Sequence, residues 1–306
     1  MPKSDATVTA FLRGLRLFIA VAAALGAAGM LPRMAAAAPQ VVTLNDGREY
    51  LIDLPANRAN APLIVALHGG GGNPQQFSRA SGLSRPANRL GYAVIYPKGS
   101  GRRLLTWNGG YCCGPAARER VDDIGFLDAV IADAADRFGL NPARVFLTGM
   151  SNGAILAEAY AAARPDAVRA VAGVAGTLDL AQYPPQRAVP LLHIHGTADT
   201  HVPYDGGPGS KGLTTTRFTP VNDVIAAFYA LNGHLVRTDR KIDKVDDGMS
   251  VAATTWSAGG HPVIRLLTVE GGGHVWPGGR RAQRQDNATG DIDATTEILR
   301  FFTENR

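Results

Sequence analysis

The sequence predicts an α/β fold with a mostly parallel, doubly wound sheet and helices on both faces. Short apolar runs typical of strands buried on both faces alternate with helix-like segments along most of the chain. No internal repeat and no linker rich in Ser, Pro or Gly divides the sequence into further domains. Such alternation places parallel strands in one sheet and helices on its two sides.

The predicted elements begin with two antiparallel strands, 41–44 and 50–54, joined through the turn residues Asn45-Asp46-Gly47. Further strands are predicted at 63–67, 92–96, 144–148, 168–174 and 190–195, with helices at 80–90, 124–138, 154–160 and 220–231. A strand pair near 252–256 and 263–269 and a helix at 292–302 complete the domain. The segment Gly206–Thr216 is of low complexity, and we expect a mobile loop there.

The helix at 124–138 has the clearest pattern. Its apolar residues recur at alternating spacings of three and four, which places Ile124, Leu127, Ile131, Ala134 and Phe138 on one face. The glycine that follows at position 139 is a typical helix end.

Residues 1–38 have the pattern of a secretory signal peptide. Lys3, Arg13 and Arg16 precede the apolar stretch 17–31, and alanines at 35–38 supply the small residues of a cleavage site. The apolar stretch is short for a membrane span, although a retained anchor is the alternative. We therefore expect a secreted domain, residues 39–306, in the extracellular space or periplasm and with no membrane contact after removal of the signal.

The charge balance gives no reason to expect a polyanionic partner. The chain has a net charge of +5, and removal of residues 1–38, which carry Lys3, Arg13, Arg16 and Arg33 against Asp5, leaves about +2. No long run of Lys and Arg remains, so we expect no nucleic-acid binding.

The two cysteines, Cys112 and Cys113, are adjacent and cannot close an ordinary loop. Export would place them in an oxidising compartment, and we predict a disulfide between the two neighbours that stiffens the turn 111–114. Two free thiols without a role are the alternative. Adjacent thiols cannot both take good tetrahedral positions on zinc unaided, so we expect no metal.

The most informative motif is Gly149-Met150-Ser151-Asn152-Gly153, between the apolar run 144–148 and the alanine-rich segment 154–160. A strand that turns sharply into a helix around G-x-S-x-G is the nucleophile elbow of the α/β-hydrolase fold. Glycines on both sides allow the tight turn and the close approach of strand and helix. We therefore predict Ser151 as a nucleophile.

A serine hydroxyl needs a base within hydrogen-bond reach, and the base needs an orienting carboxylate. In this fold the acid follows the serine in the chain and the histidine comes last. Asp199 is the best acid because it directly follows the buried strand 190–195, where ligand-facing residues lie in open α/β sheets. Asp205, in the glycine loop, and Asp223, at a helix start, are the alternatives.

His274 is the best base, because it follows the strand 263–269 in a glycine-rich segment that can fold back over the sheet edge. His261 and His234 fit surface positions better, and His201 lies too near Asp199 in the chain to be the third member. For the oxyanion we predict the backbone amide of Asn152 and one from the segment 68–72, with Gly70 favoured over Gly69 and Gly71.

Two further residue pairs carry weaker predictions. Trp107 and Trp276 lie in glycine-rich loops, where they either stack on a sugar or aromatic acyl group or form a hydrophobic lid over the triad. His193 and His195 share one face of a strand, and we expect a packed, hydrogen-bonded pair because no third metal ligand has suitable spacing.

Taken together, these residues resemble the secreted esterases related to polyhydroxybutyrate depolymerases and to feruloyl and acetyl-xylan esterases. The shared motifs are Leu67-His68-Gly69-Gly70-Gly71, Trp107-Asn108 followed by Cys112-Cys113, Val121-Asp122-Asp123-Ile124, Gly149-Met150-Ser151-Asn152-Gly153, His195-Gly196-Thr197-Ala198-Asp199 and Gly273-His274-Val275-Trp276-Pro277-Gly278. They span nearly the whole of residues 39–306.

The resemblance implies hydrolysis of carboxylic esters without a cofactor, with Ser151, Asp199 and His274 as a triad and amides near Gly70 and Asn152 as the oxyanion hole. Members act on polyhydroxyalkanoate chains or oligomers, on feruloyl esters of plant polysaccharide, or on acetylated xylan. Many extracellular polyester depolymerases carry an added polymer-binding domain, for which this sequence leaves no length. We therefore expect the partner to be a soluble ester, either an oligomeric polyester or an acylated polysaccharide fragment.

Three other functions fit the same residues. A secreted serine peptidase or an acyltransferase would share the fold and the triad, and would differ in substrate or product. A non-catalytic binding scaffold is the third, although such proteins usually lose a triad member and all three are present here.

Overall fold

The structure is a computed structural model that describes residues 38–212, 215–279 and 288–306. The predicted signal peptide, apart from its last residue, lies outside the described residues. The chain divides by its contacts into two units, Met1–Ala35 and Ala36–Arg306, and the description concerns the second. Within the described residues, no helix combines the length and the apolar character that crossing a membrane would require.

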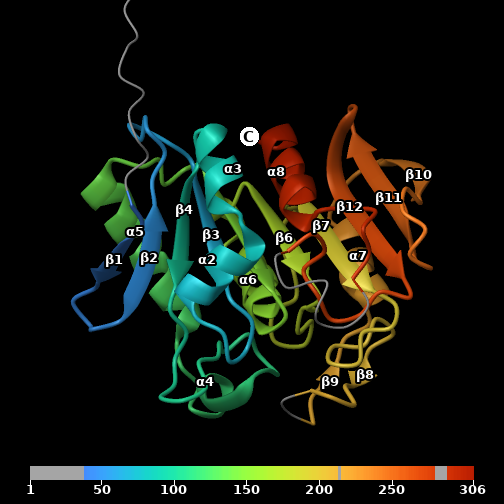
Figure 1. Cartoon of the computed structure of the whole chain (residues 1–306), viewed down its shortest axis with the longest axis horizontal. Coiled ribbons are helices and arrows are strands. Elements are labelled where there is room, and N and C mark those ends of the chain that lie inside the picture. Colours follow the sequence, from blue (N-terminus) through green and yellow to red (C-terminus); the bar gives the residue numbers. More distant parts are fainter. Residues whose placement is uncertain (1–37, 213–214, 280–287) are drawn as a thin grey trace, which may run out of the picture. The chain divides into compact units, whose positions relative to one another are not determined.

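Ten strands form one sheet in the order β1-β2-β4-β3-β5-β6-β7-β12-β11-β10 (Figure 1). The strands are β1 (Gln40–Thr43), β2 (Glu49–Asp53), β3 (Leu63–Leu67), β4 (Ala93–Pro97), β5 (Val145–Met150), β6 (Ala170–Val174), β7 (Leu191–Gly196), β10 (Val236–Ile242), β11 (Ser250–Ala258) and β12 (His261–Glu270). The central run from β4 to β12 is parallel, whereas β1, β2, β11 and β10 pair antiparallel at the two edges. The predicted α/β class with a mostly parallel sheet is confirmed.

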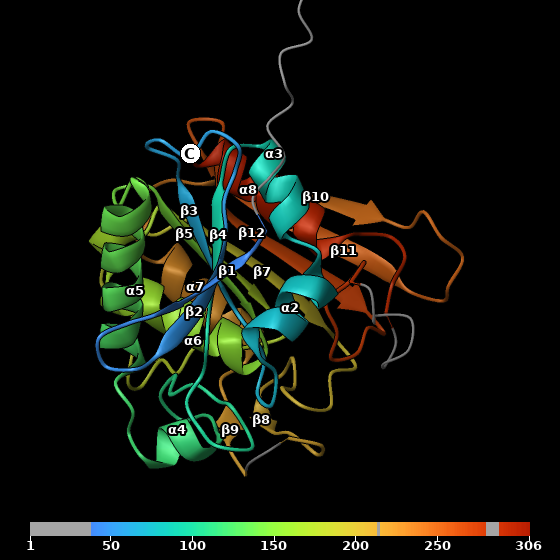
Figure 2. The same ribbon diagram turned by 60° about the vertical axis from the view of Figure 1, so that its left-hand side comes forward.

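Helices cover both faces of the sheet, as Figure 2 shows for α5 and α2. The helices are α2 (Pro74–Ser81), α3 (Ser84–Arg89), α4 (Gly114–Arg118), α5 (Asp123–Phe138), α6 (Asn152–Ala163), α7 (Val221–Tyr229) and α8 (Ala294–Glu304), with a 3₁₀ turn at Pro165–Ala167. Apolar residues of α5, α6 and α7 share one buried cluster with the sheet, and those of α2, α3 and α8 share a second. Successive residues of a strand enter opposite clusters, as Ile64 and Val65 of β3 do.

Several predicted elements differ from the structure. The helix expected at 80–90 is two helices, because Gly82 takes a left-handed conformation (φ +63°) and ends α2. Strand β10 was not predicted, since six of its seven residues are exposed and it lacks an apolar alternation. The segment expected to be a mobile loop contains β8 (Gly207–Pro208), which pairs with β9 (Arg217–Phe218).

The sheet brings four loops to one edge. Leu67 at the end of β3 pairs with Gly149 of β5, and Gly196 at the end of β7 pairs with Val269 of β12. Because these strands are parallel, the segments that follow them leave the sheet on the same side. The glycine segment after β3, the turn after β5, and the loops after β7 and β12 therefore face a common region.

Helix α6 lies close to the end of strand β3 at Gly153. A Cβ atom added there would contact the carbonyl oxygens of Leu67 and His68, at 2.6 Å from the latter. These are backbone atoms, which cannot rotate away as a flexible side chain could. A glycine is thus required at this position for the packing of the elbow on the neighbouring strand.

We expect Gly153→Ala to lower the free energy of unfolding by about 1–3 kcal/mol, despite the higher helix propensity of alanine. Gly233→Ala is the control, because an added Cβ there meets no atom within 4 Å, and its effect should stay within about 0.5 kcal/mol. Urea unfolding of both variants measures the difference. Equal stabilities would show that the β3–α6 contact relaxes without cost.

Candidate active site

Ser151 occupies the sharp turn between β5 and α6. Its backbone has φ +56° and ψ −126°, a left-handed conformation that a residue with a side chain rarely adopts. The Ser151 N–H donates to the Val174 carbonyl oxygen at 2.8 Å, which ties the turn to the end of β6. The strand–turn–helix context predicted for the G-x-S-x-G motif is therefore present, and the serine side chain is half-buried at the sheet edge.

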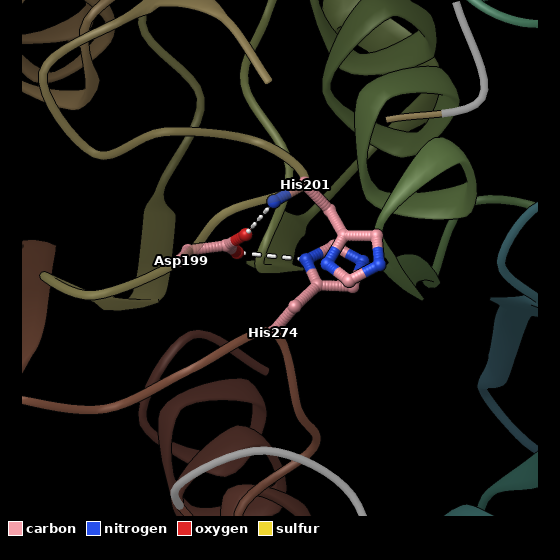
Figure 3. Close-up of side chains that lie close together, drawn as sticks. All are labelled: Asp199, His201 and His274. Atoms are coloured by element: carbon pink, nitrogen blue, oxygen red, sulfur yellow. Dashed lines mark hydrogen bonds and ion pairs between the residues drawn. The ribbon is translucent and has the colours of Figure 1, made fainter. Parts of the chain in front are cut away.

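Asp199 and His274 come together from the loops after β7 and β12 (Figure 3). His274 Nδ1 lies 2.7 Å from Asp199 Oδ2. Burial raises the pKa of Asp199, but hydrogen bonds from His195 and His274 outweigh it and hold the pKa well below its usual range. The carboxylate is therefore ionised and accepts the Nδ1–H of His274. In neutral His274 this tautomer leaves Nε2 as the basic nitrogen.

The second oxygen of Asp199 closes a tight turn. Oδ1 accepts the backbone N–H groups of His201 at 2.8 Å and Val202 at 2.9 Å. Val202 also belongs to a buried apolar cluster with Ile155 in the first turn of α6. This packing connects the Asp199 turn to the helix that begins directly after Ser151.

His201 covers one side of His274. The two rings stack with centroids 4.6 Å apart and an angle of 25° between their planes, as the overlapping rings in Figure 3 show. Among the residues that the structure describes, Asp199, His201 and His274 form the group whose ligand-type atoms, all within 4.8 Å of one another, could share a metal ion. The hydrogen bond between Asp199 and His274 accounts for the closeness of that pair, and the ring stacking accounts for that of His201 and His274.

The glycine segment after β3 lies beside Ser151. A Cβ added to Gly69 would be 3.4 Å from the Ser151 Cβ. Gly71 N–H donates to the Leu105 carbonyl and Gly72 N–H to the Gly69 carbonyl, whereas the Gly70 N–H has no acceptor within the described part of the chain. Gly70, in the turn at 70–71, is thus better placed than Gly71 to offer a free donor.

The backbone amide of Asn152 is the second predicted donor. Asn152 is the first residue of α6, and the first N–H groups of a helix have no partner within the helix. Its side chain is anchored on both sides of Trp107, where Oδ1 accepts the Trp107 N–H at 2.7 Å and Nδ2 donates to the Trp107 carbonyl at 3.0 Å. These two hydrogen bonds of the Asn152 side chain were not predicted from the sequence.

His68 fixes the start of the glycine segment. Gly99 N–H donates to His68 Nε2 at 3.1 Å, so this nitrogen is the acceptor, and His68 Nδ1–H donates to the Gly69 carbonyl at 2.8 Å. A ring nitrogen accepts only when it carries no proton, so the contact with Gly99 requires a neutral ring, whereas the contact with Gly69 needs only the Nδ1–H. Burial lowers the pKa of His68 to about 4, although the hydrogen bond to Gly69 opposes the shift.

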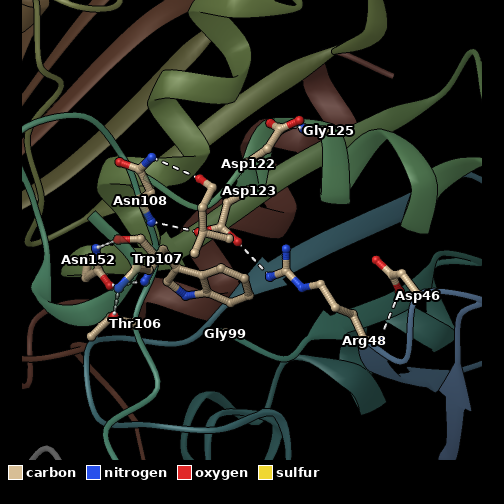
Figure 4. A network of polar contacts seen from close by, with 12 residues as sticks. Asp46, Arg48, Gly99, Thr106, Trp107, Asn108, Asp122, Asp123, Gly125 and Asn152 are labelled. Atoms are coloured by element: carbon tan, nitrogen blue, oxygen red, sulfur yellow. Dashed lines mark hydrogen bonds and ion pairs between the residues drawn. The ribbon is translucent and has the colours of Figure 1, made fainter. Parts of the chain in front are cut away.

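A polar network extends from Trp107 to the surface (Figure 4). Asn108 N–H donates to Asp123 Oδ2 at 2.7 Å, and Arg48 forms an ion pair with Asp123 Oδ1 at 2.6 Å. Asp123 is the first residue of α5, while Asp122 caps that helix by accepting the Gly125 N–H at 2.8 Å. The network thereby holds the loop that carries Trp107 against the sheet.

The two tryptophans, which were expected either to stack on substrate or to form a hydrophobic lid, are both buried. Trp107 is fully buried and its Nε1–H donates to the His68 carbonyl at 2.8 Å. Trp276 is 5% exposed, packs edge-on against Phe77 and donates to Thr295 Oγ1. Neither ring presents a face to solvent, so both support the site from within the protein.

The side chains of Cys112 and Cys113 are buried, and their sulfur atoms are in contact. They pack in the same apolar cluster as Ile155 and Val202. The segment after Trp107 is therefore attached both to the helix that follows Ser151 and to the Asp199 turn.

The expected hydrogen-bonded pair of His193 and His195 is present. His193 Nε2 lies 3.1 Å from His195 Nδ1, and the rings are nearly parallel. The pair has a third member that the sequence analysis missed, since Glu158 of α6 lies 2.8 Å from His193 Nδ1. An acidic residue in an otherwise apolar, buried helix was the available signal.

Comparison with known proteins gives one family match. A profile described as Esterase PHB depolymerase matches residues 49–202. A protein named "Putative esterase NocK" from Nocardia uniformis subsp. tsuyamanensis is 30% identical over 267 residues, which cover 79% of this chain and 74% of that protein. Feruloyl esterase C from Emericella nidulans is 28% identical over 170 residues, covering 53% of this chain and 58% of that protein.

A solved structure shares the fold. The acetyl xylan esterase from Aspergillus awamori superposes with a TM-score of 0.59 and 15% sequence identity, covering 88% of this chain and 100% of that chain. At this identity the likeness concerns the α/β-hydrolase fold.

The pKa of His68 leads to a prediction about stability. The unfolded chain binds a proton on this histidine below about pH 6.5, whereas the folded chain does so only near pH 4. Stability should therefore fall as the pH drops from 6.5 to 4, by on the order of 3 kcal/mol from this residue. Urea unfolding between pH 4.5 and 7 should show a steeper pH dependence for wild type than for His68→Gln.

His261→Gln is the control, because His261 is exposed at the start of β12. Its curve should run parallel to that of wild type. A His68→Gln curve with the wild-type slope would show that His68 binds protons in the folded state as readily as in the unfolded chain.

Proposed function

This chain belongs to the PHB depolymerase esterase family of carboxylic ester hydrolases, and we propose that it acts through an acyl-enzyme on Ser151. The observation that carries the mechanism is the 2.7 Å hydrogen bond between His274 Nδ1 and the buried carboxylate of Asp199. It lies at the sheet edge where the Ser151 turn and the glycine segment also meet. In this proposal, the base, the orienting acid, the nucleophile and the amide donors come from the segments that follow β12, β7, β5 and β3.

In the first half of the proposed reaction, Ser151 Oγ attacks the ester carbonyl carbon while His274 Nε2 takes the hydroxyl proton. The carbonyl oxygen becomes an oxyanion, which the N–H groups of Gly70 and Asn152 stabilise. When the tetrahedral intermediate collapses, His274 gives its proton to the leaving alcohol. Ser151 is left with an acyl ester.

In the second half, His274 removes a proton from water, which attacks the acyl carbon. Collapse of this intermediate returns the proton to Ser151 and releases the carboxylic acid. Asp199 remains ionised throughout, so it can stabilise the His274 cation that forms in each half. In the ground state only Asp199 of this pair is charged, whereas in the transition state His274 becomes a cation beside it. The attraction between the two charges stabilises the transition state.

For the substrate we propose hydroxyalkanoate oligomers or feruloyl or acetyl esters of polysaccharide. The family description names PHB depolymerase, one relative is named a feruloyl esterase and a structural neighbour an acetyl xylan esterase. These names support an ester whose acyl or alcohol part is an oligomer fragment.

Ser151→Ala should lower kcat/KM by at least ~10⁴-fold on the best ester, because the acyl-enzyme cannot form. The measurement is a panel of p-nitrophenyl esters of two chain lengths, methyl ferulate, acetylated xylan and hydroxybutyrate oligomers. Ser257→Ala is the control, since Ser257 pairs with Pro262 at the start of β12, the end of that strand opposite the His274 loop, and it should retain wild-type turnover.

The panel also separates the other functions. Cleavage of peptides in preference to esters would favour a peptidase, and ester or sugar products formed from added alcohols would favour an acyltransferase. Absence of turnover on every substrate would contradict the enzyme mechanism and favour a binding scaffold.

We further propose that the chain is secreted after removal of residues 1–38 and that Cys112 and Cys113 are oxidised there. Intact-mass analysis of the exported protein should show a chain beginning near residue 39. After denaturation without reductant, iodoacetamide should add no mass, and prior reduction should allow two additions. Two labelled thiols without reductant would contradict the disulfide, and an intact residue 1 would contradict the signal peptide.

A further inference from the structure

A line of buried polar side chains runs from the core to the Asp199 turn. Glu158 of α6 and His193 and His195 of β7 are all completely buried. Glu158 Oε1 and His193 Nδ1 lie 2.8 Å apart, and His193 Nε2 and His195 Nδ1 lie 3.1 Å apart. His195 Nε2 lies 2.8 Å from the Val202 carbonyl oxygen and 3.4 Å from Asp199 Oδ2.

The fold makes room for this line. Gly173 of β6 pairs in register with His193 of β7, and a Cβ added to Gly173 would collide with Glu158 Oε1. The glutamate side chain therefore crosses β6 at the one residue without a side chain and reaches the neighbouring strand. The glycine at position 173 thus allows the contact between Glu158 of α6 and His193 of β7.

The number of protons in the line follows from its hydrogen bonds. A carbonyl oxygen only accepts, so His195 Nε2 carries a proton directed at Val202. The two other contacts each need one proton as well. An ionised Glu158 with two neutral imidazoles holds one proton fewer than these three hydrogen bonds require.

One additional proton therefore completes the line and makes it electrically neutral. Without it, two lone pairs would face each other in the interior and the Glu158 charge would be uncompensated, and both arrangements are costly. Glu158 Oε2 has no hydrogen-bond partner among the described residues, so no second donor offsets the charge.

We propose that Glu158, His193 and His195 form a buried relay that retains one shared proton and positions Asp199 for the reaction. The positioning part of this inference rests on the proposed function. His195 Nε2–H donates to the Val202 carbonyl oxygen, and the backbone N–H of Val202 donates to Asp199 Oδ1. The turn is thus fixed from two sides, and Asp199 Oδ2 is left for His274.

Four titratable groups from neighbouring elements face the relay. Asp199 and His274 lie at one end, Tyr204 packs edge-on against His195, and Tyr111 lies near Glu158. Burial raises the pKa of Tyr111 to about 12 and also raises that of Tyr204, so both stay neutral up to pH 9. Asp199 is ionised over the same range. Changes between pH 7 and 9 that depend on Glu158 therefore report the relay.

The shared proton is tested by urea unfolding of wild type and Glu158→Gln between pH 7 and 9. The glutamine amide can donate to His193 Nδ1, and all hydrogen bonds of the line are then satisfied without an added proton. In wild type the folded chain holds a proton that the unfolded chain releases, so its stability falls as the pH rises. The unfolding constant of wild type should increase up to tenfold per pH unit relative to Glu158→Gln.

Glu119→Gln is the control, because Glu119 is exposed and its variant should follow wild type. Parallel curves for wild type and Glu158→Gln would overturn the shared proton. This comparison does not depend on turnover, so it remains decisive if the proposed esterase activity is not found.

The positioning role is tested at His195. His195→Phe keeps a ring but loses both nitrogens, and we expect kcat to fall about 10–100-fold with little change in KM. His195→Gln can still donate to the Val202 carbonyl and should recover most of the lost kcat. This variant also keeps the test informative if His195→Phe fails to fold. His261→Phe, at an exposed histidine, should match wild type.

A spectroscopic measurement separates the relay from the catalytic proposal. The proton between His274 Nδ1 and Asp199 Oδ2 should give a far-downfield NMR resonance in wild type and His195→Gln, and should be lost or broadened in His195→Phe. Full kcat and an unchanged resonance in His195→Phe would overturn the positioning role. An altered resonance in a protein without Ser151-dependent turnover would support the relay and contradict the proposed function.

Discussion

The site depends on one buried charge, the carboxylate of Asp199. A carboxylate removed from water is costly unless hydrogen bonds and a counter-charge compensate it. Here one oxygen accepts two backbone N–H groups of its own turn, and the other accepts from His274 and lies near His195. These polar groups come from three places: the turn itself, the loop after β12, and the strand β7. Moving any of these groups would remove part of the compensation for the buried charge.

The parallel sheet explains how residues so distant in the chain reach this charge. Parallel neighbours end at the same edge, so the segments after β3, β5, β7 and β12 meet although more than 200 residues separate the first from the last. Glycines then set the distances. Gly153 lets α6 approach β3, and Gly173 lets Glu158 reach β7, in each case because a Cβ would collide with an atom already in place.

Much of this arrangement could be predicted from the sequence, because apolar runs and small-residue turns report the strands and their ends. Ser151, Asp199 and His274 each lie shortly after a predicted strand, and that place in the sequence identifies them as candidates. What could not be predicted depends on neighbours that are not adjacent in the chain. Strand β10 has no apolar pattern because its side chains face solvent, Glu158 resembles an ordinary helix glutamate, and the burial of Trp107 depends on its hydrogen bond to the His68 carbonyl.

The two histidines at the site, His274 and His68, need opposite charge states. His274 must become a cation during each half of the proposed reaction, and the ionised Asp199 lies 2.7 Å from it. His68 lies behind the amides that would bind the oxyanion, and its ring accepts the Gly99 N–H, which a cation could not do. A protonated His68 would therefore lose its contact with Gly99. Burial without a carboxylate partner keeps His68 neutral, whereas His274 has the buried carboxylate of Asp199 beside it to stabilise a cation.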